Sequence, residues 1–177
     1  TSSSYRGGRA DGAGPPLFIK LLNFQKSTLG RAVEIFEREA RLAETVMHHG
    51  AARALDYFIL QRESSVGLCT VREFILGRAL HEEMAERPHD PSDVASIVAE
   101  LLSTLRGLHA LSPPVVHGSL STSNVIRREG RGRLMVVDFA ALRANRPEWL
   151  GDDDMEAARV FLAPEQLQGL STAAADL

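Results

Sequence analysis

The first half of the chain alternates short apolar runs with polar turns, a pattern typical of β-strands. The runs lie at residues 17–24, 55–60 and 67–74. One helix is predicted among them, over residues 28–49, because apolar side chains recur there at helical spacing and Gly50 supplies a stop. Residues 1–16 are rich in Ser, Gly and Pro, which predicts a loop or a frayed strand.

The second half carries the strongest helical pattern, over residues 91–110. Asp90 can cap this helix, and Pro91 suits its first position. One continuous apolar face is formed by Val94, Ile97, Val98, Leu101, Leu102, Leu105 and Leu108. Two short strands follow, at residues 124–128 and 134–137. Strands first and helices later predict an α+β chain in two lobes.

Composition narrows the functional classes. The chain has 177 residues, a net charge of −3 and no long basic run, so nothing favours binding to nucleic acid or to an anionic membrane. No apolar stretch approaches the ~18 residues of a membrane span. One cysteine, Cys69, excludes an internal disulfide and favours a reducing, cytoplasmic location. The chain does not begin with Met, and both ends are interpreted as cuts in a longer protein.

Two charged residues stand at apolar positions. Lys20 lies inside the first apolar run, where an ammonium group must either extend into water from an edge strand or meet an anion. Glu39 lies three residues after Phe36, on the inward face of the predicted helix, although its neighbouring glutamates are expected to be solvated. The two side chains could also neutralise each other as an ion pair.

Polar residues also gather after the long helix. Residues 117–124 (HGSLSTSN) precede one short strand, and Asp138 follows the next. Asn124 and Asp138 therefore end up at neighbouring strand ends, where their oxygen atoms could converge on a divalent cation.

The order of these features resembles the eukaryotic-type protein-kinase family along nearly the whole chain. Phe18-Ile19-Lys20 resembles the V-A-I-K strand, and residues 117–124 stand where H-R-D-L-x-x-x-N belongs. Asp138-Phe139-Ala140 stands in place of D-F-G, and Ala163-Pro164-Glu165 matches A-P-E. Residues 36–40 resemble the αC segment, residues 72–77 resemble the hinge, and Asp176 falls where the next helix usually has an Asp.

This resemblance implies a two-lobed kinase-like fold. Residues 1–73 would form part of a β-rich N-lobe with the αC helix, and residues 74–177 part of an α-rich C-lobe. Lys20, held by Glu39, would bind the phosphates of ATP, and Glu73 would belong to the nucleotide-binding hinge. Asn124 and Asp138 would bind Mg²⁺.

The departures from the family fall mainly on the substrate side. Ser119 replaces the catalytic Asp, Ser121 replaces the following Lys, and Gly118 replaces the Arg that receives an activation-loop phosphate. Ala157 and Ala158 replace the Gly and Thr near the end of the activation segment. A serine hydroxyl is no base near pH 7, and general-base catalysis contributes about 10²–10⁴-fold.

Further departures concern regulation and the nucleotide. No Ser, Thr or Tyr lies between Asp138 and Glu165, which excludes phosphorylation there. Arg72, directly before the hinge Glu73, could intrude on the adenine pocket, and Ala140 removes the flexible Gly beside the metal-binding turn. No G-x-G-x-x-G loop is visible, although residues 1–5 could be its tail.

The resulting expectation is an ATP-binding pseudokinase that acts as a regulatory or scaffolding module on a protein partner or on neighbouring domains of its own chain. Two alternatives stay open. One is an active serine/threonine kinase with an atypical catalytic loop. The other is a small-molecule phosphotransferase of the aminoglycoside-kinase type, because His117-Gly118 followed by Asn124 resembles that family's H-G-D-x-x-x-x-N loop.

Overall fold

The computed structural model describes residues 2–25, 32–130, 132–139, 160–168, 170 and 172–177. Its contacts divide the chain into two compact units. Unit 1 comprises residues 1–47 and 53–74, and unit 2 comprises residues 48–52 and 75–177. We describe each unit by itself.

Unit 1 is built on a four-stranded antiparallel sheet with the strand order β1-β2-β4-β3. The strands are β1 (Ser2–Gly7), β2 (Leu17–Gln25), β3 (Ala54–Gln61) and β4 (Ser65–Glu73). The last three confirm the predicted strands to within two residues at each end. For residues 1–16 the pattern left loop and frayed strand open, and the structure pairs residues 2–7 with β2 over six rungs.

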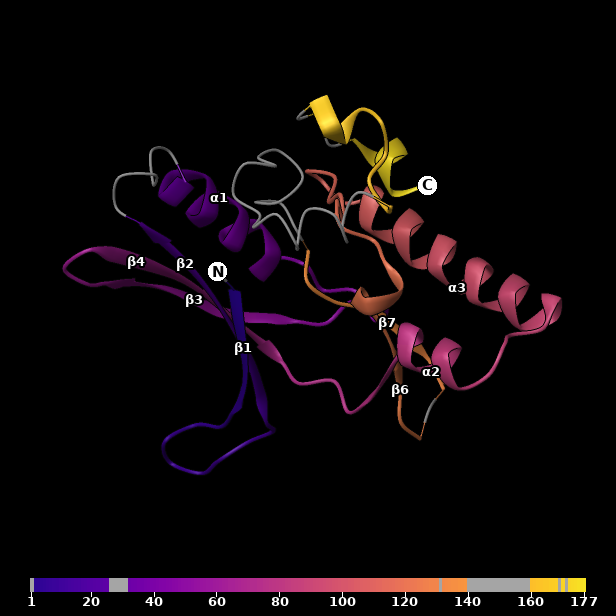
Figure 1. Ribbon diagram of the computed structural model, residues 1–177, viewed down its shortest axis with the longest axis horizontal. Helices are drawn as coiled ribbons and strands as arrows, with labels where there is room; N and C mark the ends of the chain where they lie inside the picture. Colours follow the sequence, from indigo (N-terminus) through magenta and orange to yellow (C-terminus); the bar gives the residue numbers. More distant parts are fainter. Residues whose placement is uncertain (1, 26–31, 131, 140–159, 169, 171) are drawn as a thin grey trace. The chain divides into compact units, whose positions relative to one another are not determined.

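Helix α1 (Ala32–Glu44) lies over one face of this sheet (Figure 1). Its buried side chains include Phe36, whose ring meets the edge of the Tyr57 ring on β3 at 5.8 Å. The helix ends five residues before the predicted end at His49. The backbone N–H and the hydroxyl of Thr45 both donate to the Leu42 carbonyl, which tightens the last turn and stops the α-helical ladder. Met47, which lies within the predicted range but beyond the observed end of the helix, is 74% exposed.

The described residues of unit 2 contain a second sheet, with the strand order β5-β6-β7, and two α-helices. Its elements are β5 (Gly77–Ala79), α2 (Leu80–Glu86), α3 (Pro91–His109), β6 (Val125–Arg128) and β7 (Leu134–Val136). The structure thus confirms the long helix and the two short strands that follow it. Strand β5 and helix α2 were not predicted, because three and seven residues are too few to show a period.

Helix α3 agrees with its prediction at both ends but not along its face. The Asp90 carboxylate accepts hydrogen bonds from the backbone N–H groups of Ser92 and Asp93, so the predicted cap is formed. Leu105 and Leu108 are buried near the end of the helix. Farther toward its start, Val98 and Leu102 are 46% and 47% exposed, so the apolar face is only partly covered by the described residues. Within the described part of the chain, no helix has both the length and the apolarity needed to cross a membrane.

Candidate functional site

The segment from His117 to Asn124 joins α3 to β6, and its start is fixed by a buried carboxylate. The side chain of Asp176 is only 1% exposed. Its two oxygens accept hydrogen bonds from the backbone N–H groups of His117 and Gly118, each at 2.7 Å. Nε2 of His109 lies 2.9 Å from the same carboxylate. The carboxylate therefore holds the loop's backbone through peptide groups, whatever side chains the loop carries.

The imidazole of His117 makes a second set of contacts that fix the loop, and it is fully buried. Its Nε2 lies 3.0 Å from the carbonyl oxygen of Val137, which can only accept, so Nε2 carries the proton. Its Nδ1 accepts from the backbone N–H of Ser119 at 3.3 Å, and its ring lies 4.7 Å from the ring of Phe139. Burial lowers the pKa of His117 below its ordinary value, which favours the neutral ring that these contacts require.

Ser119 and Asn124 close the loop on itself. The Asn124 side-chain nitrogen donates to the Ser119 carbonyl oxygen at 2.8 Å, and it also lies 3.3 Å from the Ser119 hydroxyl. The loop is thus formed around Ser119, the position that the sequence resemblance matches to the family's catalytic Asp. The group at that position is a neutral hydroxyl.

Asp138 stands next to this loop. The backbone N–H of Val137 donates to the Asn124 carbonyl at 2.9 Å, one rung beyond the pairing of Val125 with Val136. The structure therefore brings Asn124 and Asp138 to neighbouring strand ends. Asp138 has a φ of +59°, and no other described non-glycine residue has a positive φ. Such backbone strain is typical of functional sites.

The oxygen atoms of Asn124 and Asp138 suit a hard cation such as Mg²⁺, which commonly takes one or two protein ligands and completes its shell with phosphate and water. The described residues hold no cluster of three or more His, Cys, Asp or Glu side chains able to bind a metal alone. A cation here would accordingly need further oxygen atoms, from water or from a bound phosphate.

Gln166 is a structural residue of this site that the sequence did not single out. It is 2% exposed, and its side-chain nitrogen donates to the carbonyl oxygen of Gly118 at 2.9 Å. Its side-chain oxygen accepts from the backbone N–H of Ala163, also at 2.9 Å. Gln166 thereby connects the A-P-E-like segment to the loop.

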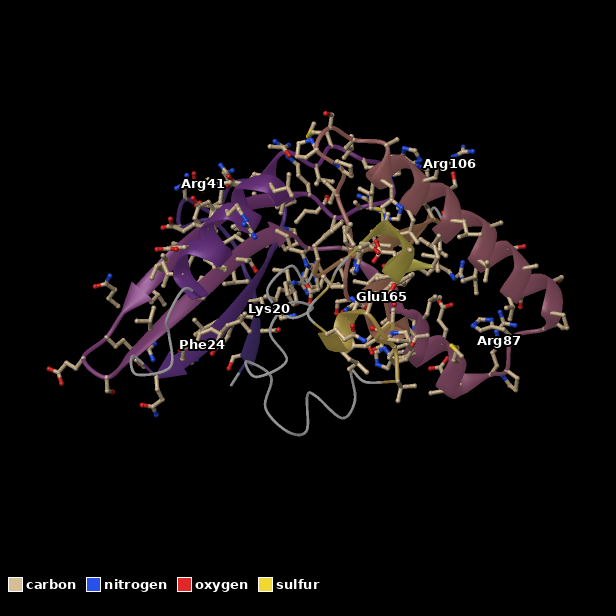
Figure 2. The ribbon with its side chains drawn as sticks, turned by 90° about the horizontal axis from the view of Figure 1, so that it is seen from above. Lys20, Phe24, Arg41, Arg87, Arg106 and Glu165 are labelled. Atoms are coloured by element: carbon tan, nitrogen blue, oxygen red, sulfur yellow. The ribbon has the colours of Figure 1, made fainter. Side chains whose placement is uncertain are left out.

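The remaining predicted residues belong to unit 1. Lys20 is half-buried on β2, where it pairs with Thr70 on β4 and with Ser4 on β1 (Figure 2). Glu39 lies on α1, but its side chain is outside what the structure describes, so the predicted ion pair with Lys20 stays a prediction. The Glu73 carboxylate accepts from the backbone N–H of Arg53 at 2.9 Å. Ser119, Asn124 and Asp138 thus belong to unit 2, and Lys20, Glu39 and Glu73 belong to unit 1.

Some predictions concern residues outside the described part of the chain. These are Ala140, Ala157 and Ala158.

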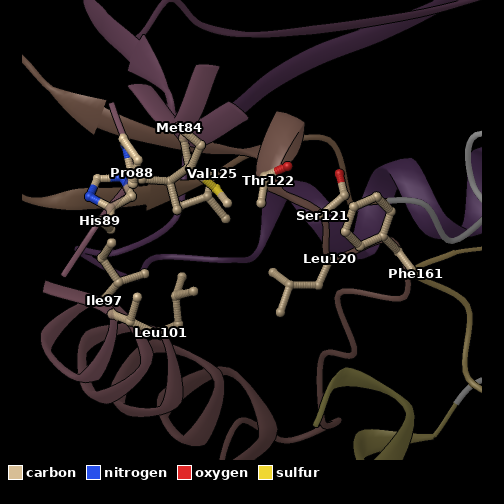
Figure 3. A pocket seen from close by; sticks show the side chains of 12 residues that line it. Met84, Pro88, His89, Ile97, Leu101, Leu120, Ser121, Thr122, Val125 and Phe161 are labelled. Atoms are coloured by element: carbon tan, nitrogen blue, oxygen red, sulfur yellow. The ribbon is translucent and has the colours of Figure 1, made fainter. Parts of the chain in front are cut away.

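Unit 2 also contains an apolar pocket of about 500 Å³ beside the loop (Figure 3). Side chains of α2, of α3 and of the loop line it, and the described lining residues include no carboxylate, lysine or arginine. They are Leu80, Met84, Pro88, His89, Val94, Ile97, Leu101, Leu120, Ser121, Thr122, Val125 and Phe161. Such a lining suits apolar groups and not phosphates.

Curated relatives of this chain are serine/threonine kinases. It is 27% identical over 162 residues to serine/threonine-protein kinase pkn2 of Myxococcus xanthus, covering 88% of this chain and 19% of the relative. It is 32% identical over 114 residues to serine/threonine-protein kinase B of Synechocystis, covering 63% of this chain and again 19% of the relative. The chain therefore spans about a fifth of the length of these relatives. No protein-family model matches the chain.

The fold has a counterpart among solved structures. The kinase domain of Mycobacterium tuberculosis PknI matches with a TM-score of 0.69 over 98% of this chain and 62% of the PknI chain. At 17% identity this likeness supports the fold alone, and it confirms the predicted α+β kinase-like architecture. Together, the curated relatives and this structural match support the resemblance of the chain to the eukaryotic-type protein-kinase-like family.

Proposed function

We propose that the chain is a pseudokinase module, which keeps a phosphate-binding and cation-binding role but has lost efficient phosphoryl transfer. The observation that carries this proposal is Ser119. The loop around it is formed, with Asp176 and His117 holding its backbone and Asn124 closing it. A neutral hydroxyl occupies the position at which the family has its proton acceptor.

The chemical consequence follows from the acidity of the groups involved. A serine hydroxyl neither accepts a proton near pH 7 nor brings a negative charge that would orient a substrate hydroxyl. General-base catalysis contributes about 10²–10⁴-fold, so its loss leaves at most a trace of transfer. Ser121 removes in addition the positive charge that steadies the transferred phosphate in the family.

ATP and Mg²⁺ are the ligands that fit the remaining groups. Lys20 would bind phosphate oxygens, supported by Glu39, and Glu73 would mark the hinge end of the site. Asn124 and Asp138 offer oxygen ligands at adjoining strand ends, one of them on a strained backbone. Bound Mg²⁺ would neutralise phosphate charge. This chain's own contribution would be to hold and orient the phosphates.

A module of this kind would act through a protein partner or through neighbouring domains of the same chain, in the cytoplasm. The second candidate is a serine/threonine kinase with residual activity, and it is favoured by the names of the curated relatives. The two candidates differ in a single measurable property, which is phosphoryl transfer that depends on Lys20.

The test compares the purified protein with Lys20→Ala and Ser119→Asp variants, using radiolabelled ATP and general protein substrates. We expect transfer by the unmodified protein to equal that of Lys20→Ala, and Ser119→Asp to restore little because Ser121 remains. Transfer that disappears in Lys20→Ala would overturn the proposal.

Thermal stability then tests ligand binding, because a ligand at a hundred times its Kd stabilises the folded state by ~2.7 kcal/mol. The part of this stabilisation that needs Mg²⁺ should vanish in Asp138→Asn.

A further inference from the structure

Two side chains of unit 1 stack directly beside Lys20. The Arg72 guanidinium carbon lies 3.8 Å from the centre of the Phe18 ring, which is the geometry of a close cation–π contact. The two residues face each other across the β2–β4 pairing. Arg72 also donates from Nη1 to the carbonyl oxygen of Glu73 at 3.2 Å, so the guanidinium is held at both sides.

The register puts this stack on the same face of the sheet as Lys20. Side chains two residues apart on a strand share a face, so Phe18 and Lys20 point the same way, and so do their partners Arg72 and Thr70. Tyr57, the partner of Thr70 on β3, meets Phe36 of α1, so this is also the face that α1 covers. One rung of the sheet beyond the stack lies the pair of Leu17 and Glu73.

A bound nucleotide would therefore have to lie across the stacked side chains of Phe18 and Arg72. Its phosphates would lie at Lys20 and its base near Glu73, and the rung of Phe18 and Arg72 lies between the two. The family's V-A-I-K strand has an alanine where this chain has Phe18, so an aromatic ring replaces a methyl group there. Phe18 and Arg72 are both half-buried, which places them against the sheet face.

We propose that the stack of Arg72 on Phe18 fills the place of the nucleoside base, so that this site takes a polyphosphate group at Lys20 without a purine. The inference rests on the proposed phosphate-binding function and specifies its ligand class. ATP binds here through its phosphates, and its adenine contributes no affinity. Removing the guanidinium opens the base position.

The experiment measures, by calorimetry and thermal shift with Mg²⁺, the binding of ATP, inorganic tripolyphosphate and adenosine. In the unmodified protein we expect ATP and tripolyphosphate to bind equally and adenosine not to bind. In Arg72→Met and in Phe18→Ala, we expect ATP to bind about tenfold more tightly than tripolyphosphate, equivalent to about 1.4 kcal/mol, and adenosine to bind measurably.

The matched control is Arg41→Met. Arg41 is another arginine of unit 1, on α1 (Figure 2), and its Nε donates to the Tyr57 hydroxyl at 2.9 Å. This variant loses the same charge, and it should match the unmodified protein in its affinities for ATP and tripolyphosphate and in its lack of adenosine binding. Melting without ligand identifies any variant that fails to fold, and Arg72→Gln serves as the second substitution at position 72.

The outcomes separate this inference from the proposed function. Adenosine binding by the unmodified protein, or equal ATP and tripolyphosphate affinities in every folded variant at positions 18 and 72, would overturn the inference. Adenosine binding that is gained only in those variants, without tripolyphosphate binding by any protein, would uphold the blocked base position and contradict the phosphate-binding function.

Discussion

The interiors of the two units are stabilised by different kinds of contact. In unit 1 the most deeply buried side chains are apolar, with Phe36 of α1 at 1% exposure and Leu68 of β4 at 0%. Every buried polar or charged residue in the described part of the chain belongs to unit 2. Three of these four residues, His117, Gln166 and Asp176, bind backbone groups at the start of the loop from His117 to Asn124.

This difference explains how the side chain at position 119 can vary while the loop keeps its form. The buried network contacts peptide groups of His117 and Gly118, and none of these contacts involves the side chain of Ser119. The sheet of unit 1 is likewise held by backbone pairing and by the core beneath α1. Bulky side chains such as Phe18 and Arg72 can then lie on the face that carries Lys20 without disturbing the strands.

Replacing Asp176 should have the largest effect on stability. Asp176→Ala leaves the N–H groups of His117 and Gly118 and the ring of His109 without their buried acceptor. Removing one partner from a buried charged network costs about 3–5 kcal/mol. We expect a loss of this size in the free energy of unfolding, measured by urea denaturation.

The control for this variant is Asp11→Ala, because Asp11 is exposed and its carboxylate caps a local turn through the N–H of Ala13. This change should leave the unfolding midpoint nearly unaltered. Equal losses for the two variants would contradict the role of the buried network.

Gln166→Leu should have an intermediate effect. The substitution removes one acceptor for the Ala163 N–H and one donor to the Gly118 carbonyl, in a site where water has little access. A buried group left without its hydrogen-bond partner costs about 1–3 kcal/mol. Gln168→Leu is a matched control two residues away, at an exposed position, and should change the free energy of unfolding much less. A larger loss for Gln168→Leu would refute the assignment.

The features that the sequence predicted depend on local patterns. Alternating and helical periods located β2, β3, β4 and α3, and the Asp90 cap is an interaction between residues two and three apart. The adjacency of Asn124 and Asp138 was predictable for a similar reason, because two strands joined by a short turn pair with each other.

The features of the site that were missed depend on long-range contacts. Gln166 reaches a carbonyl 48 residues away, and Asp176 binds an N–H 59 residues away, so no local period reports either contact. The resemblance placed Asp176 at a family position but not its three partners. The stack of Arg72 on Phe18 became visible only with the register of β2 against β4.

The smallest predicted effect is a pH dependence of stability that arises from His117. Burial holds its pKa in the folded protein below the ordinary value of 6.5. As the pH falls through about 6.5, the unfolded chain takes up a proton on this residue before the folded protein does. The unfolded state then binds more protons, so the free energy of unfolding falls as the pH falls, by at most ~1.4 kcal/mol per pH unit. The contribution is fully present above pH 6.5 and is lost between that value and the lower pKa of the folded state.

Urea denaturation between pH 8 and pH 5 should therefore show a steeper loss of stability toward acid pH for the unmodified protein than for His117→Gln, which removes the titrating ring. His81→Gln, at an exposed position on α2, should keep the full slope. An unchanged slope in His117→Gln would show that other groups produce the acid loss and would contradict this prediction.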